Sequence, residues 1–158
     1  MRLLFKQKFL SLLDSYDVYD GNNNVQFKVK GQFSFGHSFI IYNKYNEEVG
    51  ALKQKIFTIL PQYTIYKNKE ELGIITKRIS FIHPKFDVSF GGYTVEGDFF
   101  EWDYKVLKEG RHIATISKKI LSLTDTYIID VIDEEALIVL MIVLSIDSIK
   151  DRRSQHND

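Results

Sequence analysis

The chain has 158 residues with 21 basic and 21 acidic side chains, and it contains no cysteine. The lack of cysteine excludes disulfides, thiolate metal sites and cysteine nucleophiles, and it is compatible with the cytoplasm, where we expect the protein to reside. A net charge of zero argues against nucleic-acid binding through the field of the whole molecule. A domain of this length buries roughly two-thirds of its unfolded surface and needs no crosslinks.

The N-terminal stretch predicts neither a signal peptide nor a membrane span. Lys6 and Lys8 interrupt the apolar run that starts at Leu3 before a signal-peptide core could form. The longest apolar stretch, residues 136–144, is far shorter than the ~20 residues that a spanning helix needs. We therefore expect a soluble protein without a transmembrane span.

One short unit recurs four times: a basic residue, an apolar residue after it, a turn-forming residue six positions on and an aromatic residue eight positions on. The spacing predicts a strand, a bend and a second strand, because Asp and Pro favour bends. Alternation then places Lys53 and Lys55 on one face of their strand and Leu52 and Ile56 on the other. The units are Lys8, Phe9, Asp14 and Tyr16; Lys55, Ile56, Pro61 and Tyr63; Arg78, Ile79, Pro84 and Phe86; and Lys119, Ile120, Asp125 and Tyr127.

A second repeat divides the chain into two halves. Residues 29–33 (VKGQF) resemble residues 95–99 (VEGDF), and each segment lies between two of the basic units. A glycine inside a strand indicates a bulge or a barrel corner. The count of about a dozen strands favours a mainly β protein, a closed antiparallel barrel of two six-stranded halves, over an open sheet. Further turn signals lie at 20–24, 43–48, 68–71, 91–92 and 108–110.

The segment after Asp133 predicts a buried helix. Residues 136–146 are apolar at every period, and five of them are β-branched, which by propensity favours a strand. The run is longer than a buried strand, however, Asp133 can cap a helix, and Glu134 and Glu135 complement its dipole. A helix that is apolar on every side must be buried on every side. We predict that it begins near Glu134 inside the barrel, that the domain spans 1–150, and that the polar tail 151–158 is disordered.

Several motifs match a known family in the same order along the chain. They are KQK at 6–8 and 53–55, LPQY at 60–63, YTVEGDF at 93–99, SKK at 117–119 and the apolar segment 136–147. Together they resemble the LURP-one-related proteins, which belong to the tubby C-terminal-like superfamily with the phospholipid scramblases, and the resemblance spans residues 3–149. It implies a twelve-stranded barrel around a central C-terminal helix. Better-known relatives bind phosphoinositide headgroups or are associated with lipid movement in membranes, which implies a lipid as a partner.

The paired lysines Lys6 and Lys8, and Lys53 and Lys55, are the candidate binding residues. Two ammonium groups on one strand face could hold a phosphate, and tubby-type domains bind phosphorylated lipids with basic side chains. The simpler alternative is that outward lysines provide solubility and protect sheet edges. Our leading hypothesis is a non-enzymatic module that binds anionic lipid headgroups, or another anionic partner, on the outer barrel face. A structural or regulatory protein-interaction domain without a small ligand is the alternative.

Four polar residues are phased towards the barrel interior. A buried ammonium is costly unless it is paired, so we expect these residues at the barrel rim, or a lysine among them paired with Glu134, Glu135 or Asp147. The four are Gln7, Gln54, Lys77 and Lys118.

No motif predicts catalysis, a cofactor or a metal, and we expect none of them. The histidines His37, His83, His112 and His156 lack zinc spacing, and no P-loop, serine elbow or dinucleotide motif is present. In the scramblase relatives a calcium site lies in the region that corresponds to the acidic residues before the helix. These residues lack the EF-hand pattern, so capping and a solvated turn are the preferred interpretation. A hydrolase that uses surface carboxylates is a minor alternative; its candidate residues are Glu96, Asp98, Glu101 and Asp103.

Overall fold

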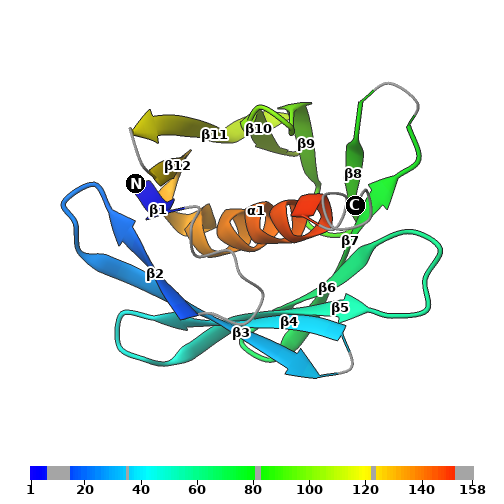
Figure 1. Ribbon diagram of the computed structural model, residues 1–158, viewed down its shortest axis with the longest axis horizontal. Coiled ribbons are helices and arrows are strands. Elements are labelled where there is room, and N and C mark those ends of the chain that lie inside the picture. Colours follow the sequence, from blue (N-terminus) through cyan, green and yellow to red (C-terminus); the bar gives the residue numbers. More distant parts are fainter. Residues whose placement is uncertain (7–14, 35, 81–82, 122–123, 152–158) are drawn as a thin grey trace.

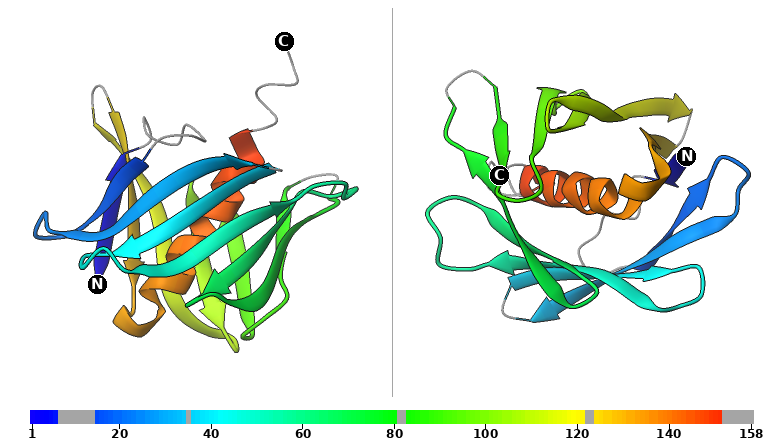
Figure 2. Two further views of the ribbon diagram at one scale, coloured as in Figure 1. Left: turned by 90° about the horizontal axis from the view of Figure 1, so that it is seen from below. Right: turned by 180° about the vertical axis from the view of Figure 1, so that it is seen from behind.

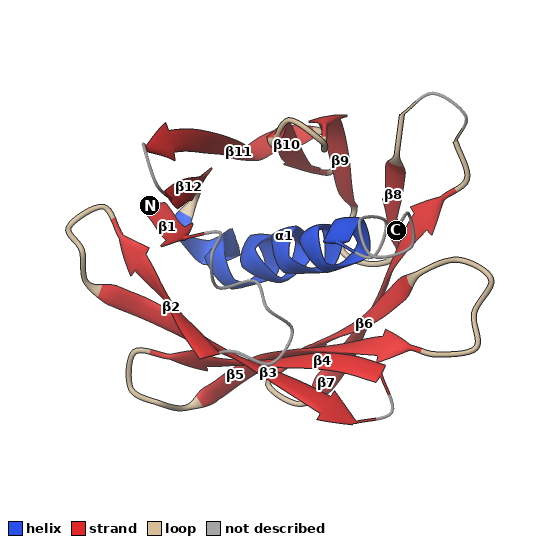
Figure 3. Ribbon diagram, in the orientation of Figure 1, coloured by secondary structure: helices blue, strands red, loops and turns tan. Residues whose placement is uncertain are grey.

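The computed structural model describes residues 1–6, 15–34, 36–80, 83–121 and 124–151. In this part of the chain twelve antiparallel strands form one sheet that curves into a nearly closed barrel, and helix α1 runs through its interior (Figures 1 and 3). The predicted fold class is confirmed. The strands are β1 (Arg2–Lys6), β2 (Ser15–Asp20), β3 (Val25–Ser34), β4 (Gly36–Asn43), β5 (Glu48–Lys55), β6 (Gln62–Lys67), β7 (Glu70–Arg78), β8 (Lys85–Val88), β9 (Tyr93–Asp98), β10 (Asp103–Lys108), β11 (Arg111–Leu121) and β12 (Thr124–Val131).

The two halves of the chain join where β1 pairs with β12. The strand order is β8-β7-β6-β5-β4-β3-β2-β1-β12-β11-β10-β9, so β8 and β9 form the two edges of the sheet. Within the described residues these two edges share no backbone ladder, although they lie beside each other in Figure 1. The rings of Phe86 and Phe99 meet across this seam with centroids 5.0 Å apart in an edge-to-face contact. The barrel is therefore closed at this seam by side chains rather than by backbone hydrogen bonds.

The fourfold unit corresponds to the hairpins β1–β2, β5–β6, β7–β8 and β11–β12. Its aromatic residues Tyr16, Tyr63, Phe86 and Tyr127 are all buried. The inward polar residues lie directly opposite these aromatics in the strand register, so the residue before each basic position packs across from the buried ring. The described pairs are Gln54 with Tyr63, Lys77 with Phe86 and Lys118 with Tyr127.

Two details of the repeat prediction are wrong. Ile56 and Ile79 do not face the core, because β5 ends at Lys55 and β7 at Arg78, and both isoleucines are exposed in the loops that follow. Asp125 does not form a bend, because it already pairs with Ile120 inside the β11–β12 ladder. Residues 7–14, which hold the first bend with Gln7, Lys8, Phe9 and Asp14, and residues 152–158 of the tail lie outside the described residues.

The C-terminal segment forms a 3-10 turn, η2 (Asp133–Glu135), followed by helix α1 (Ala136–Asp151). Residues 138–149 are buried without interruption, which confirms the predicted helix inside the barrel. Burial on every side overrides the strand propensity of its β-branched residues. The hydroxyls of Ser145 and Ser148 donate to the carbonyls of Met141 and Leu144, each at 2.8 Å, so these two hydroxyl donors are satisfied within the helix.

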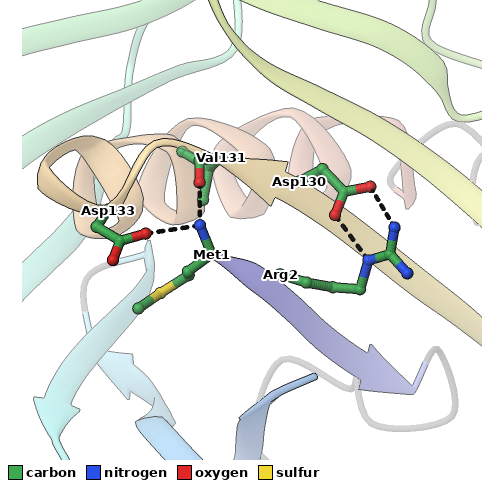
Figure 4. A network of polar contacts seen from close by, with 5 residues as sticks. All are labelled: Met1, Arg2, Asp130, Val131 and Asp133. Atoms are coloured by element: carbon green, nitrogen blue, oxygen red, sulfur yellow. Dashed lines mark hydrogen bonds and ion pairs between the residues drawn. The ribbon is translucent and has the colours of Figure 1, made fainter. Parts of the chain in front are cut away.

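The predicted cap at Asp133 is wrong, because its carboxylate binds the chain's amino group rather than a helix N–H (Figure 4). The Met1 ammonium donates to Asp133 Oδ1 at 2.6 Å and to the Val131 carbonyl at 2.5 Å. Beside it, Arg2 donates two hydrogen bonds to Asp130, at 2.7 and 3.0 Å, which hold the pKa of this carboxyl below its usual value. These contacts join β1 to β12 where the two halves of the sheet meet.

The connections between strands lie at two opposite ends of the barrel. Because all neighbours are antiparallel, the β3–β4, β5–β6, β7–β8 and β9–β10 connections share one end, which we call the distal end. Helix α1 starts after β12 at the opposite end and ends at the distal end (Figure 2). Any side chain at the tip of the β5–β6 loop is therefore on the same end as the C-terminal turn of the helix.

Gly97 and Gly110 form a matched pair that tests the strand corner. Both have positive φ, +135° and +76°, but a Cβ on Gly97 would lie 2.5 Å from the Asp103 carbonyl oxygen, whereas a Cβ on Gly110 would meet nothing within 4 Å. We expect G110A to lower the free energy of unfolding by about 1–2 kcal/mol through φ strain alone. G97A should cost about 1–3 kcal/mol more, through overlap with the backbone. Urea denaturation measures both, and equal losses would contradict the close approach at Gly97.

Candidate functional site

The outer face of β3 and β5 carries four exposed lysines. In β3 the buried Val29 points inward, so its neighbours Lys28 and Lys30 point outward. In β5 the buried Leu52 likewise places Lys53 and Lys55 on the outside. The predicted phase of Lys53 and Lys55 is therefore confirmed, and β3 adds two lysines that were not among the candidate residues.

Three of these lysines have only uncharged partners in the strand register. Lys30 lies opposite Ser15 and Ile40, Lys53 opposite Ser38 and Thr64, and Lys55 opposite Gln62. Lys28, in contrast, lies opposite Asp17. None of Lys30, Lys53 and Lys55 forms an ion pair with any described residue. We call these three lysines the basic face.

Two tyrosines are interleaved with the basic face. The Lys30 ammonium lies 5.2 Å from the ring centroid of Tyr42, and that of Lys53 lies 4.9 Å from that of Tyr66. Such contacts are worth ~0.5–1 kcal/mol at exposed sites and orient the two lysine stems. Adjacent strands are about 4.8 Å apart and alternate residues about 6.7 Å. Lys30 is in line with Ala51 through Ile40 on β4, so its Cα lies roughly 12 Å from that of Lys53 and roughly 16 Å from that of Lys55. This spacing suits several phosphate or carboxylate groups rather than one enclosed anion.

The other predicted pair is not part of this face. Lys6 is the last residue of β1, its side chain and the whole of Lys8 lie outside the described residues, and β2, β3 and β4 separate β1 from β5. Four strand spacings correspond to about 19 Å along the sheet. The fold therefore does not bring the backbone of Lys6 close to Lys53 or Lys55. A role for Lys6 and Lys8 stays a prediction.

A second polar cluster lies at the start of the helix. Glu135, only 8% exposed, accepts a hydrogen bond from the Tyr93 hydroxyl and one from Lys108 Nζ at 2.5 Å. Burial alone would raise the pKa of Glu135, but the hydrogen bonds from Lys108 and Tyr93 lower it below its usual value. Burial and the bond to Glu135 raise the pKa of Tyr93 to about 12. The cluster ties the helix start to β9 and β10.

The acidic residues before the helix thus have structural partners. Asp130, Asp133 and Glu135 pair with Arg2, the Met1 ammonium and Lys108 respectively. The partner at Glu135 is Lys108 rather than Lys77 or Lys118, because β10 passes beside the helix start. No sequence spacing indicates this pair, since Lys108 belongs to neither repeat. Placement of Lys77 and Lys118 at the barrel rim, or pairing with Glu134 or Asp147, stays a prediction.

The opposite end of the helix places a buried carboxylate among tyrosines. Asp147 is 3% exposed, and Tyr16 and Tyr104 are buried as well. Burial first, and then the negative charge of Asp147, raises the pKa of both phenols well above the usual value. These phenols are therefore neutral at physiological pH and form a polar layer of the core.

A shallow depression of about 430 Å³ lies on the outside of β9, β10 and β11. Two of the carboxylates considered for hydrolysis, Glu96 and Asp103, line it together with Lys105 and His112. Glu96 forms an exposed ion pair with Lys105 at 3.2 Å, and His112 Nε2 lies 3.0 Å from the Thr115 hydroxyl. Asp98 instead accepts hydrogen bonds from the backbone N–H groups of Phe100 and Glu101, which fixes the β9–β10 turn.

Comparison with known proteins identifies the family. A family model described as LURP-one-related matches residues 1–146. The chain belongs to the LURP-one-related family. Among its relatives is the uncharacterised protein YxjI of Bacillus subtilis (strain 168), 30% identical over 152 residues that cover 94% of this chain and 93% of YxjI.

A solved structure has a similar fold. The X-ray structure of a protein from Arabidopsis thaliana superimposes with a TM-score of 0.57 at 15% identity, over 93% of this chain and 91% of the plant protein. At this identity the similarity concerns the fold alone. Within the described residues of this LURP-one-related chain, no helix combines the length and the apolar character needed to cross a bilayer.

Replacing Glu135 tests the cluster at the helix start. We expect E135L to lower the free energy of unfolding at neutral pH by about 1–3 kcal/mol, because the hydroxyl of the buried Tyr93 loses its acceptor. E96L is the matched control, since it removes the acid of an exposed lysine pair and should cost little. Urea denaturation measures both variants.

The difference in unfolding free energy between wild type and E135L should depend on pH, because the pKa of Glu135 is lowered in the folded protein. A carboxyl whose pKa is lower in the folded state stabilises the protein above its unfolded pKa, near 4.5, and this contribution is lost as the pH falls through the folded value. The difference between wild type and E135L should therefore shrink in acid. A difference that stays constant down to acid pH would contradict a charged Glu135 in the fold.

Proposed function

We propose that this LURP-one-related protein is a non-enzymatic module that binds anionic lipid headgroups with the basic face on β3 and β5. The observation that supports it most directly is that Lys30, Lys53 and Lys55 are exposed and have no charged partner in the strand register. Lysines that serve only for solubility are commonly interspersed with acids. A cluster without acids creates a local positive potential on a chain whose net charge is zero.

The form of the face favours a surface of many headgroups over one enclosed anion. The lysines lie on a convex barrel wall, and the interior, where a deep pocket would form, is filled by α1. Lysine is a point charge on a flexible stem and suits phosphates whose positions vary. Tyr42 and Tyr66 add amphipathic rings of the kind that lie well at a headgroup layer.

The expected affinity is modest. Each lysine close to an anionic membrane contributes about 1 kcal/mol, and this contribution is screened over a Debye length of ~10 Å at 0.1 M salt. Three lysines alone therefore support weak, salt-dependent and reversible attachment. The proposal includes no catalytic step, since Glu96 is paired with Lys105 and Glu135 is engaged at the helix start.

Neutralising part of the basic face tests the proposal. We expect K53Q/K55Q to bind phosphatidylcholine vesicles that contain phosphatidylglycerol about thirtyfold more weakly than wild type, since two charges correspond to about 2 kcal/mol. Co-sedimentation at low salt measures the binding, and added salt should reduce it for the wild type. The control is K44Q/K69Q, which removes two exposed lysines from turns at the opposite end of the barrel. Equal binding by all three proteins would contradict the proposed face.

A further inference from the structure

The loop between β5 and β6 presents apolar side chains to solvent. Phe57 is 100% exposed and Ile59 is 99% exposed, and Ile56 beside them is exposed at 37%. Of the eight large apolar side chains that are exposed in the described part of the chain, five lie in distal-end loops. The other two of the five are Ile79, at 69%, in the β7–β8 loop and Phe100, at 50%, in the β9–β10 loop.

The conformation of the loop is defined rather than loose. The Thr58 hydroxyl donates to the Leu60 carbonyl at 2.8 Å, and Ile56 lies close to Gly36, where a Cβ would come within 2.9 Å of it. Phe57 has a φ of +59°, a region that bulky residues rarely adopt. Strain of this kind persists where the surrounding structure imposes it and is common at functional sites. The strain here holds an aromatic ring out in water.

This loop continues directly from the basic face. Lys53 and Lys55 occupy the last outward positions of β5, and Phe57 and Ile59 follow two and four residues after Lys55. The β7–β8 loop with Ile79 belongs to the next hairpin of the sheet. The β5–β6 loop lies at the distal end of the barrel (Figure 2), so its apolar side chains form a tip with the basic face behind it.

We propose that Phe57 and Ile59 insert into the interfacial layer of an anionic bilayer, so that the barrel attaches to the membrane by its distal end. This inference rests on the proposed function, and it adds a second contact and an orientation. The basic face would then contact the lipid headgroups, which lie just above the inserted side chains. A few inserted aromatic and aliphatic side chains anchor peripheral proteins to membranes when they act together with lysines that attract anionic lipids.

The exposure of the tip favours a bilayer over a protein partner. A side chain that is 99–100% exposed touches almost nothing in its own fold and stands out from the surface. A protein partner would need a matching pocket and usually 20–30 residues a side. A bilayer accepts protruding apolar side chains without shape complementarity, and its anionic headgroups match Lys53 and Lys55.

Fluorescence with brominated lipids tests the insertion. The variant F57W places an indole at the tip, and the native Trp102, 5% exposed, provides a background that lipid should not reach. We expect a blue shift and quenching by brominated chains in vesicles of phosphatidylcholine with phosphatidylglycerol. Wild-type protein under the same conditions should show little quenching. An F57W signal that ignores the brominated chains while the protein co-sediments would overturn the insertion.

Polar substitution provides the matching loss of function. We expect F57N/I59S to bind the same vesicles about tenfold or more weakly, from the lost burial of two apolar side chains. Because Asn tolerates positive φ, its denaturation midpoint should stay equal or rise, so weaker binding would not reflect unfolding. The control Y45S removes an exposed aromatic, 72% exposed, from the β4–β5 turn at the opposite end, and should bind as wild type.

The outcomes separate this inference from the proposed function. If K53Q/K55Q loses binding while F57N/I59S binds as wild type, the insertion is overturned and the basic face stands. If wild type does not bind anionic vesicles at all, both fall. Loss of self-association by F57N/I59S in sedimentation, without any effect on lipid binding, would show that the tip contacts another protein copy and would also overturn the insertion.

Discussion

The fold depends on one constraint: helix α1 is apolar on every side and must be enclosed on every side. Its burial from Ile138 to Ile149 is continuous, and the sheet around it supplies the enclosing apolar surface. The enclosure also decides where binding can occur. An empty barrel of this kind could hold a small ligand, but here the helix fills the interior, so contacts with a partner are left to the outer wall and the ends.

A sheet that closes around a helix needs stabilising side-chain contacts where the backbone ladder ends and where the helix begins. The β1–β12 junction carries the Met1 and Arg2 pairs, the start of the helix carries the Glu135 cluster, and the seam between β8 and β9 carries the Phe86–Phe99 contact. Each of these places uses a different interaction, which matches its surroundings. The exposed β1–β12 junction uses ion pairs, the helix start joins a buried carboxylate to a lysine and a tyrosine, and the seam uses two buried rings.

The sequence predicts the parts of this structure that repeat. Period-two alternation and the fourfold unit indicate the hairpins and the outward direction of Lys53 and Lys55, because these depend on residues close in the chain. The sequence does not predict that Lys30 lies on the same face as Lys53. This placement depends on the register of the β3–β4 and β4–β5 pairings, which no local pattern encodes. The Lys108–Glu135 pair and the exposure of Ile56 could not be predicted for similar reasons. The pair depends on how the strands pass the helix, and the exposure of Ile56 depends on where β5 ends.

The duplicated halves also explain how a neutral chain can present a charged face. Lys30 in β3 occupies the position of Glu96 in β9 within the matching VKGQF and VEGDF segments, and Gln32 corresponds to Asp98. The first of these outward positions is thus basic in the first half of the barrel and acidic in the second, and the other is neutral in the first half and acidic in the second. Total charge cancels, but its distribution does not, since β3 and β9 are separated by five strands along the sheet through β1 and β12. Near an anionic surface this asymmetry orients the first half of the barrel towards that surface. The β5–β6 loop, which carries Phe57, then faces the surface as well.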